Sequence, residues 1–378
     1  MPMKSNIRLL AALTALCLLL SACSGAVPPQ DDNSVPQGPN AEVSNPEIPV
    51  ESPDPVIPEP EAESFILSFA GDCTLGNNYD AEHASGTFRS VVKDNYAYPF
   101  SNVKQYFEND DFTFVNLECA LTESDPTEEE MVELSEHQFR FRGPASYAKI
   151  LVEGHVEFAS CANNHSKDYG KQGLYDTWEA LEAENIHYAS FGKTCLATTQ
   201  SGLKIGVIAI FFNFTDASMR NQIKALKDKG AELIVVSIHW GDEGTYEPNS
   251  LQQSLGRRAI NNGANIVFGH HSHTLQRIEP YNGGVIYYSL GNFSFGGNRN
   301  PSDKDTAIIR QEVLRYTDGS IGLGDLEVIP CRVSTVDNWN DFCPTPYEKD
   351  HPGYDRVLSK LEGSFHDFTL KGEVLPAS

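Results

Sequence analysis

The chain has 378 residues and a formal net charge of −24, and 21% of its residues are charged. This length allows one large or two small domains. The acidic balance and the lack of a basic stripe argue against nucleic acid as a partner. A polyanionic substrate would also be repelled, unless bound cations changed the local field.

The N-terminal segment predicts export. Lys4 and Arg8 form a short basic region, an apolar run at 9–20 is too short to span a bilayer comfortably, and a Leu-Ser-Ala-Cys sequence ends at Cys23. This pattern is typical of a bacterial lipoprotein signal over residues 1–22, with Cys23 as the lipid-modified first residue of the mature chain. An ordinary secretory signal cut nearby is the alternative. The first interpretation predicts an extracytoplasmic protein that is lipid-anchored to the cell membrane.

Residues 23–63 predict a disordered tether. From Ser24 to Glu63 the sequence is rich in Pro, Glu and Asp and contains no Lys or Arg. Such a segment cannot bury enough apolar surface to offset its ordering entropy, so it should be extended and self-repelling. We expect a folded domain over residues 64–335 and a C-terminal extension without a recognisable motif over residues 336–378.

Short apolar runs alternate with helical patterns through the folded part. We expect strands at 65–70, 112–116, 138–142, 156–160, 203–212, 233–238, 265–268 and 285–290. We expect helices at 100–109, 145–153, 173–184, 217–229 and 251–262. The acidic segment 123–136 reads as a loop. The alternation predicts an α/β domain, whose polar site residues lie beyond the carboxyl ends of its strands.

A histidine cluster follows the strand at 265–268, with three imidazoles within four residues at His270, His271 and His273. Residues two apart in an extended chain point the same way. We therefore expect His271 and His273 to bind one metal or two adjacent metals, and His270 to point elsewhere. Three solvated loop histidines are the alternative.

Other ligand-type residues stand at the ends of other expected strands. They are Asp72, Glu118, Asn164, His165, His239 and Asn292. Carboxylate, imidazole and amide oxygen together suit Mn, Zn or Fe. If one carboxylate bridges, the set suffices for two divalent metals about 3.5–4 Å apart. Read singly, Asp72 could be a helix N-cap, Glu118 a solvated loop residue, Asn164 a turn former and His239 a half-buried packing residue.

The cysteines allow two interpretations. Cys73, Cys119 and Cys161 fall at strand ends beside candidate ligands. We expect them to be small buried packing residues, with thiolate ligation as the alternative. Export permits disulfides, and a bridge between Cys331 and Cys343 is an open alternative to two free thiols.

The strand-end residues form motifs in a fixed order. The motifs are Gly71-Asp72, Asn116-Leu117-Glu118, Ala162-Asn-Asn-His165, His239-Trp240-Gly241 and Gly269-His-His-Ser-His273. This set resembles the CapA family of bacterial poly-γ-glutamate capsule-synthesis proteins, which are similar to calcineurin-like metallophosphoesterases. The resemblance covers about 65–295. It implies a four-layer α/β/β/α sandwich of the metallophosphoesterase type, with two mixed central sheets flanked by helices and metals at one sheet edge.

The resemblance also implies a role for each motif residue. The implied metal ligands are Asp72, Glu118, Asn164, His239, His271 and His273. Among these, Glu118 takes the place of a bridging aspartate, while Asp72 and His273 serve one metal and the remaining three complete the other site.

The implied catalytic residue is His165, which matches the histidine that contacts the scissile phosphate and protonates the leaving group in phosphoesterases. Asp168 either orients His165 or caps a helical turn. Asn163 and Asn292 are the candidate substrate-binding residues.

Two departures from the phosphoesterase pattern weaken the implied activity more than the implied metal binding. Thr74 stands where the pattern has a histidine, and Glu118 stands where it has an aspartate. One metal site is therefore a ligand short.

Three functions follow as hypotheses. The first is a surface-anchored, metal-dependent hydrolase that acts on an anionic polymer, poly-γ-glutamate by the resemblance, or on a phosphoester. The second is a non-catalytic accessory module that binds the polymer or a membrane synthase. The third is a structural lipoprotein with a vestigial site. Retention of His165 favours the first, and the departure at Thr74 favours the second.

Overall fold

The computed structural model describes residues 61–135, 137–365, 368–369 and 373–374, all of which belong to one unit, Pro58–Ser378. The expected signal, the lipidation site at Cys23 and nearly all of the expected tether lie outside the described residues. Within the described part, no helix combines the length and hydropathy needed to cross a bilayer.

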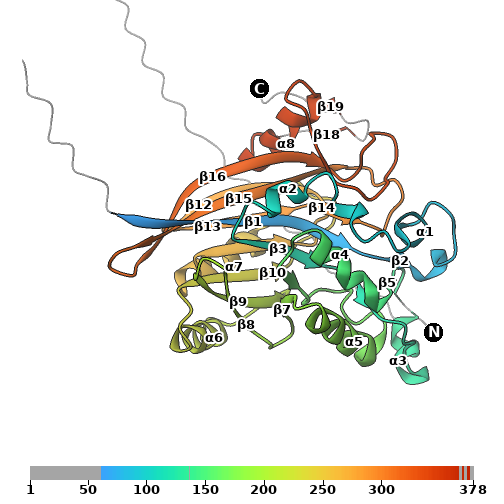
Figure 1. The fold of residues 1–378 in the computed structure, drawn as a ribbon, viewed down its shortest axis with the longest axis horizontal. Helices are drawn as coiled ribbons and strands as arrows, with labels where there is room; N and C mark the ends of the chain where they lie inside the picture. Colours follow the sequence, from blue (N-terminus) through green and yellow to red (C-terminus); the bar gives the residue numbers. More distant parts are fainter. Residues whose placement is uncertain (1–60, 136, 366–367, 370–372, 375–378) are drawn as a thin grey trace, which may run out of the picture. The chain divides into compact units, whose positions relative to one another are not determined.

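The first sheet is mixed and has the order β17-β16-β15-β1-β3-β6-β7, with β14 also paired to β1 (Figure 1). Its strands are β1 (Ala62–Thr74), β3 (Phe112–Leu117), β6 (Phe158–Ser160), β7 (His187–Ala189), β14 (Asn292–Phe295), β15 (Asp305–Tyr316), β16 (Ile321–Arg332) and β17 (Thr345–Pro346). Strands β1, β3, β6 and β7 run parallel, and β15 to β17 continue antiparallel from β1.

The second sheet is also mixed and has the order β12-β13-β11-β10-β9-β8. Its strands are β8 (Cys195–Thr198), β9 (Lys204–Phe211), β10 (Leu233–His239), β11 (Ile266–His270), β12 (Leu275–Tyr281) and β13 (Gly284–Leu290). The central strands β9, β10, β11 and β13 are parallel. Strand β10 is buried along its whole length, as expected of a parallel strand covered on both faces.

The two sheets pack face to face around one apolar core. Phe69 of the first sheet stacks on Phe114 with ring centroids 4.7 Å apart. The same ring lies 5.2 Å from Phe268 and 5.3 Å from Tyr287 of the second sheet. Aromatic pairs at such distances add to the free energy of burial, so this stack holds the two sheets together.

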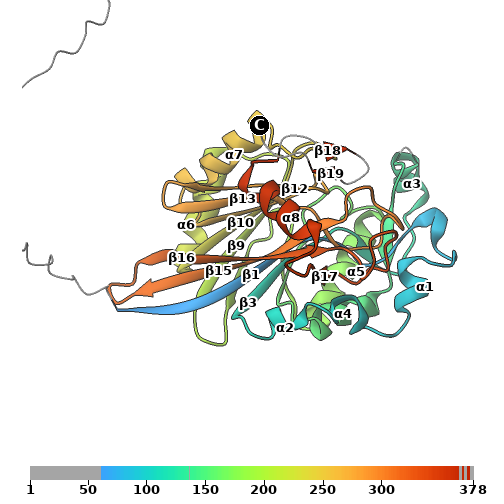
Figure 2. The same ribbon diagram turned by 90° about the horizontal axis from the view of Figure 1, so that it is seen from above.

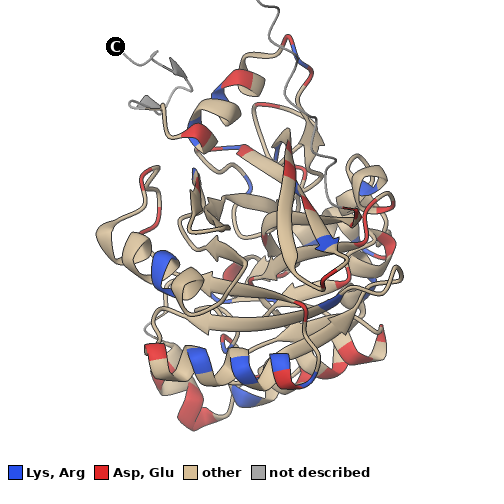
Figure 3. Ribbon diagram, turned by 90° about the vertical axis from the view of Figure 1, so that its left-hand side faces the viewer, with Lys and Arg blue, Asp and Glu red and all other residues tan. Residues whose placement is uncertain are grey.

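Helices cover both outer faces. The first sheet is covered by α1 (Phe88–Val92), α2 (Lys104–Phe107), α4 (Ala148–Glu153) and α5 (Gly170–Ala183). The second is covered by α6 (Asp216–Asp228) and α7 (Ser250–Asn261). Charged residues are dense on several helices and loops, whereas most strands are largely uncharged (Figure 3). The expected four-layer α/β/β/α arrangement, with two mixed sheets flanked by helices, is confirmed.

Smaller elements complete the domain. They are the three-stranded sheet β2 (Asn77–Asn78), β5 (Phe141–Gly143) and β4 (Ala120–Leu121), the helix α3 (Glu128–Leu134), the 3-10 turns η1 (Tyr79–Ala81), η2 (Tyr98–Phe100) and η3 (Ala145–Tyr147), and the pair β18 (Phe368–Thr369) and β19 (Glu373–Val374).

The C-terminal region packs onto both sheets. Strand β17 pairs with β16, and α8 (Pro352–Glu362) packs across β12, β15 and β16 (Figure 2). Val357 and Leu361 of α8 join the core between the sheets. Lys360, on the same helix, is buried and bonds Asp303 at 2.8 Å and Asp305 at 2.7 Å.

Two local predictions are wrong. The segment 123–136, expected as a loop, contains the helix α3. This helix begins at a capping box. The Thr127 side chain accepts a hydrogen bond from the Glu130 amide, and the Glu130 side chain accepts one from the Thr127 amide. The expected helix at 100–109 is reduced to η2 and α2.

All six cysteines of the described part are free thiols. The bridge between Cys331 and Cys343 is therefore not formed. Cys331 directs its Sγ to the Ile329 carbonyl at 3.3 Å, and Cys343 directs its Sγ to the Tyr98 carbonyl at 3.3 Å. Cys73, Cys119 and Cys161 are buried as expected of packing residues. Burial raises the pKa of the Cys73 and Cys161 thiols to about 12, which disfavours thiolates there.

Candidate metal centre

The expected ligands converge because the carboxyl ends of parallel strands from both sheets meet at one edge. Asp72 of β1 is paired with Asn116 of β3 and with Asn292 of β14. His239, at the end of β10, is paired with His270, at the end of β11. Glu118 directly follows β3. The two sets of strand ends thus present carboxylates from one sheet to imidazoles from the other.

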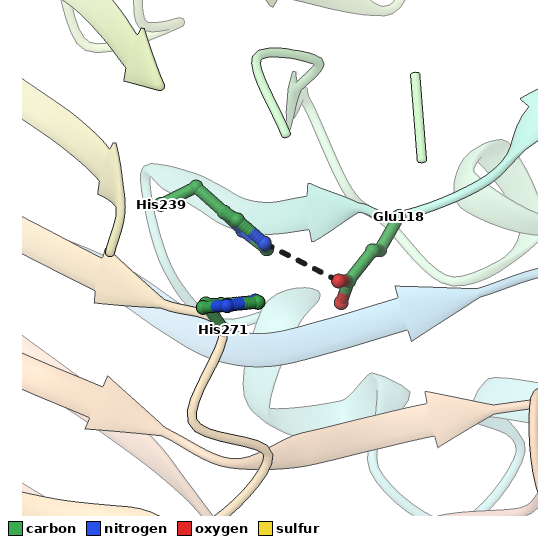
Figure 4. A group of neighbouring side chains, drawn as sticks. All are labelled: Glu118, His239 and His271. Atoms are coloured by element: carbon green, nitrogen blue, oxygen red, sulfur yellow. Dashed lines mark ion pairs between the residues drawn. The ribbon is translucent and has the colours of Figure 1, made fainter. Parts of the chain in front are cut away.

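Glu118, His239 and His271 point toward one another (Figure 4), and each offers a ligand atom within 4.8 Å of those of the others. His239 Nε2 lies 3.4 Å from Glu118 Oε1. Asp72, Glu118 and His273 form a second such group. His273 Nδ1 lies 3.2 Å from Asp72 Oδ2, and its Nε2 lies 3.9 Å from Glu118 Oε1. Glu118 is common to both groups, as a bridging carboxylate must be.

The histidine cluster owes its shape to two left-handed residues. His271 has a φ of 93° and His273 a φ of 56°. A positive φ is uncommon for residues other than glycine and often marks a functional site. The chain therefore turns sharply after β11 instead of continuing extended, and this turn brings both side chains to the ligand groups.

The prediction that His270 points elsewhere is wrong. Its Nδ1 lies 3.5 Å from Asp72 Oδ1, and its Nε2 lies 3.0 Å from Ser237 Oγ. His270 is still part of strand β11, so it points the same way as Phe268, into the space between the sheets. It forms the buried floor of the site beside Asp72.

The ligand groups fit a divalent metal because their polar atoms are buried without partners. Buried side-chain atoms that lack a hydrogen bond among the described residues include Asp72 Oδ2, both Glu118 oxygens, Asn164 Oδ1, both His239 nitrogens and His271 Nδ1. Each such group costs about 1–3 kcal/mol when left unsatisfied. The carboxylate and imidazole atoms in this set belong to the two ligand groups described above. Such unpartnered atoms are ligands that a cation would satisfy, and their chemistry suits Mn, Zn or Fe.

The pKa values of the ligand carboxylates and of His273 also indicate a cation site. Burial and the neighbouring Asp72 raise the pKa of Glu118 well above its usual value. Burial would also raise the pKa of Asp72, but His270 and His273 hold it below its usual value. Burial lowers the pKa of His273, yet Glu118 and Asp72 raise it to about 10. The two buried carboxylates are therefore stabilised in their charged form by positive charge nearby, which a divalent cation would supply.

The remaining imidazoles are held neutral. Burial, with a contribution from His271, lowers the pKa of His239 well below its usual value. Burial and the neighbouring His273 lower the pKa of His271. Neutral imidazoles keep a lone pair, which metal ligation requires.

Next to the ligand groups, His165 Nδ1 lies 2.7 Å from Asp168 Oδ2, and the same oxygen accepts the Phe141 backbone N–H at 2.7 Å. Burial raises the pKa of Asp168, and His165 partly offsets this effect. His165, His273 and Asn292 line a cavity of about 280 Å³. Because Nδ1 is engaged by Asp168, Nε2 is the ring nitrogen of His165 that can exchange a proton with a molecule bound in the cavity.

The two asparagines expected to bind substrate are already engaged inside the protein. Asn163 Nδ2 donates to Asn116 Oδ1 at 3.1 Å and to the Leu117 carbonyl at 2.8 Å, while its Oδ1 accepts from the His165 amide. Asn292 Oδ1 lies 3.0 Å from His273 Nδ1, and its Nδ2 donates to the His273 carbonyl. Asn163 therefore holds the loop that carries Asn164 and His165, and Asn292 holds His273 at the cavity wall.

Sequence reasoning missed two residues of the site besides His270. Asn116 donates to Asp72 Oδ1 at 2.9 Å and so fixes one ligand oxygen. Glu243 offers a carboxylate within 4.8 Å of the ligand atoms of His271 and His273. Its place shortly after the His239-Trp240-Gly241 motif was the available signal. Thr74, in contrast, donates its hydroxyl to the Glu118 carbonyl at 3.2 Å.

Comparisons with known proteins agree with the motif order. Residues 66–211 and 198–297 match the family described as bacterial capsule synthesis protein PGA_cap. The chain is 28% identical over 304 residues to the capsule biosynthesis protein CapA of Bacillus anthracis, covering 72% of this chain and 68% of that one. It is 28% identical over 319 residues to the PGA biosynthesis protein CapA of Bacillus subtilis, covering 78% and 77%.

A third relative is a probable polyglutamine synthesis accessory protein of Mycobacterium tuberculosis, 26% identical over 332 residues, covering 75% of this chain and 82% of that one. Among solved structures, the NAD nucleotidase of Haemophilus influenzae aligns with a TM-score of 0.40 at 11% identity. The alignment covers 80% of this chain and 56% of the nucleotidase, so the chain spans little more than half of that structure.

Proposed function

Because the chain belongs to the bacterial capsule synthesis protein family PGA_cap, as its motif order predicts, we propose that it serves the synthesis or export of an anionic capsule polymer and carries a metal-dependent, phosphoesterase-like hydrolytic centre. The polymer class follows from the relatives, whose names specify capsule, PGA or polyglutamine synthesis. Poly-γ-glutamate is the substrate class that we assign.

One observation carries the hydrolytic part of this proposal. A buried set of unpartnered ligand atoms, centred on Glu118, His239 and His271, lies beside an imidazole that is oriented for proton transfer. A metal with a purely structural role would need the ligands but not His165, which shares a cavity with His273. The combination is the one that hydrolysis of a phosphoester or an acyl bond needs.

Each residue then has a chemical task. A divalent metal held by Asp72, Glu118, His239, His271 and His273 would lower the pKa of bound water and polarise a phosphoryl or acyl oxygen. His165 supplies a proton to the leaving group from Nε2, and Asp168 stabilises the charged ring through Nδ1. Asn116 holds Asp72 through a hydrogen bond, with His270 next to it, and Asn292 holds His273.

We also propose that the protein works outside the cytoplasm, anchored by lipid on Cys23 with residues 23–63 as a tether. The N-terminal sequence pattern supports this location. An anchor at the membrane surface suits contact with a membrane synthase and with a growing polymer. Metabolic labelling with a palmitate analogue tests it: the wild-type protein should be labelled and Cys23→Ser should not.

A non-catalytic accessory role is the second candidate. Thr74 places a hydroxyl, bonded to the Glu118 carbonyl, where phosphoesterases have an imidazole. The name of the Mycobacterium tuberculosis relative includes the word accessory. In this case a bound cation would bridge the protein to polymer carboxylates without cleaving them.

One experiment separates the two candidates. The full-length protein, purified in detergent without chelator, is analysed for metals and assayed with bis-p-nitrophenyl phosphate and with poly-γ-glutamate, alongside His165→Asn. The hydrolase proposal predicts bound transition metal in both proteins and hydrolysis only in the wild type. Metal binding without hydrolysis of any substrate by the wild type would favour the accessory role.

A further inference from the structure

The two groups of metal ligands are unequal. Glu118, His239 and His271 form one group. Asn164, which directly precedes His165 in the sequence, carries a buried oxygen without a partner. The other group has only Asp72, Glu118 and His273. Thr74 cannot complete it, because its hydroxyl is already directed to the Glu118 carbonyl. A transition metal usually takes four or more ligands, so this group lacks a donor.

A carboxylate is available from the solvent side. Glu243 is exposed, lines the same cavity as His165 and His273, and offers an oxygen within 4.8 Å of the ligand atoms of His271 and His273. It also lies close enough to Glu118 to raise the pKa of that carboxyl further. Glu243 therefore faces both ligand groups.

The loop that carries Glu243 is held by hydrogen bonds to the residues on either side of Glu243. The Gly244 amide donates to the Ser272 carbonyl at 2.8 Å, which joins the loop to the histidine turn. The Thr245 carbonyl accepts from Thr274 Oγ1 at 2.6 Å and from Gln276 Nε2 at 2.9 Å. A side chain on a backbone held in this way is positioned in advance, as ligand sites require.

The other side of the loop is held as well. Asp242 Oδ2 accepts from Asn249 Nδ2 at 2.8 Å, and Gly241 adopts a φ of 86°, which places the turn directly after Trp240. The loop is therefore tied to the start of α7 on this side and to the histidine turn on the other.

We propose that Glu243 is a metal ligand that supplies, from the solvent side of the centre, the donor missing at Thr74. The inference rests on the proposed metal centre and deepens it. Glu243 forms a third ligand group with His271 and His273, one residue from each of the other two groups. With Asp72 and Glu118 it gives the centre three carboxylates, which is an oxygen-rich set. Such a set favours Mn²⁺ over Zn²⁺ relative to an imidazole-rich position.

The test uses the full-length protein after removal of metal and titration with Mn²⁺, followed by calorimetry and by electron paramagnetic resonance. The wild type should bind two ions and show the signal of a spin-coupled pair. Glu243→Gln should lose the coupled signal and bind one of the two ions roughly 10- to 100-fold more weakly. Glu243→Asp, which keeps a carboxylate, should recover part of the affinity.

Glu247→Gln is the matched control, because Glu247 is an exposed carboxylate of the same loop outside the ligand groups. It should behave as the wild type. Equal Mn²⁺ stoichiometry and affinity in Glu243→Gln and wild type would overturn this inference and leave the proposed function intact. A wild-type protein that binds neither Mn²⁺, Zn²⁺ nor Fe²⁺ would overturn the metal centre and the inference together.

Discussion

Asp168 accepts two hydrogen bonds on one oxygen, from His165 Nδ1 and from the Phe141 backbone amide, each at 2.7 Å. The Phe141 ring also lies 4.5 Å from the His165 ring. Strand β5 therefore fixes both members of the pair, and the imidazole has one orientation at the cavity wall.

This relationship predicts the effect of Asp168→Asn. The amide keeps the shape but loses the charge that stabilises a protonated His165, so kcat for a phosphodiester should fall roughly 10- to 100-fold. Metal content should stay at the wild-type level, because Asp168 belongs to neither ligand group. Asp228→Asn, a change on the surface of α6, serves as control. Loss of metal in Asp168→Asn would show instead that Asp168 is needed to position the metal ligands.

Substitutions of the ligand histidines and of His165 should distinguish loss of metal binding from loss of proton transfer. His239→Ala and His271→Ala each remove a donor from the group around Glu118 and should lose bound metal by elemental mass spectrometry. His165→Ala should keep metal and lose hydrolysis. His155→Ala is the control, since His155 is exposed and pairs with Glu108. Full metal content in His271→Ala would contradict the assigned site.

Glu157 should make stability depend on pH. Burial raises its pKa from 4.5 to about 7, although its Oε2 accepts from the Thr113 amide. The folded state therefore binds this proton more tightly than the unfolded state, and stability falls as the pH rises from about 4.5 through 7. Its full effect on the free energy of unfolding is roughly 3 kcal/mol.

Glu157→Gln removes this titration while its amide oxygen can still accept from Thr113. The variant should match the wild type in free energy of unfolding at pH 5 and exceed it at pH 8, as measured by urea denaturation. Glu153→Gln, at an exposed position, should change neither value. Parallel pH curves for wild type and Glu157→Gln would refute the raised pKa.

Lys360 should stabilise the junction between α8 and the first sheet. It is buried between Asp303 and Asp305. Burial would raise the pKa of Asp305, but Lys360 and Arg356 hold it below its usual value. The stabilisation is thus present above the ordinary aspartate pKa and is lost as the pH falls through the lowered one.

Lys360→Met leaves two buried carboxylates short of positive charge. The free energy of unfolding at pH 7 should fall by roughly 3–5 kcal/mol, and the deficit should shrink as the pH falls below the ordinary aspartate pKa. Urea denaturation of the full chain measures both effects, with the exposed Lys349→Met as control. A change below about 1 kcal/mol at pH 7 would mean that the cluster contributes little to stability.

Two features of the fold were not expected from the sequence. The long strands β15 and β16 carry charged residues such as Arg310 and Glu327, which pair across the hairpin. Their apolar alternation is therefore weak, and only the sheet reveals them, in which β15 pairs with β1 and β16 pairs with β15. Helix α3 lies in an acidic run, and Glu130 there accepts from the Lys171 amide of α5. That contact joins residues far apart in the sequence, which a local pattern does not show.

The sequence by itself determined the alternation of buried strands and helices and the residues that follow each strand. Apolar runs such as 233–238 can only be stable when covered on both faces, and parallel strands bring their carboxyl ends to one edge. These two rules suffice to collect Asp72, Glu118, His239 and His271 as one candidate site before any coordinates are known.

Only the tertiary structure decided which imidazole faces which carboxylate. His270 keeps the alternation of β11 and lies against Asp72, whereas left-handed turns at His271 and His273 bring those two side chains to the ligand groups. Glu243 reaches the site because Gly244 bonds Ser272 across the cavity rim. Both outcomes depend on contacts between segments distant along the chain, and the free energy of those contacts exists only after the two sheets have packed.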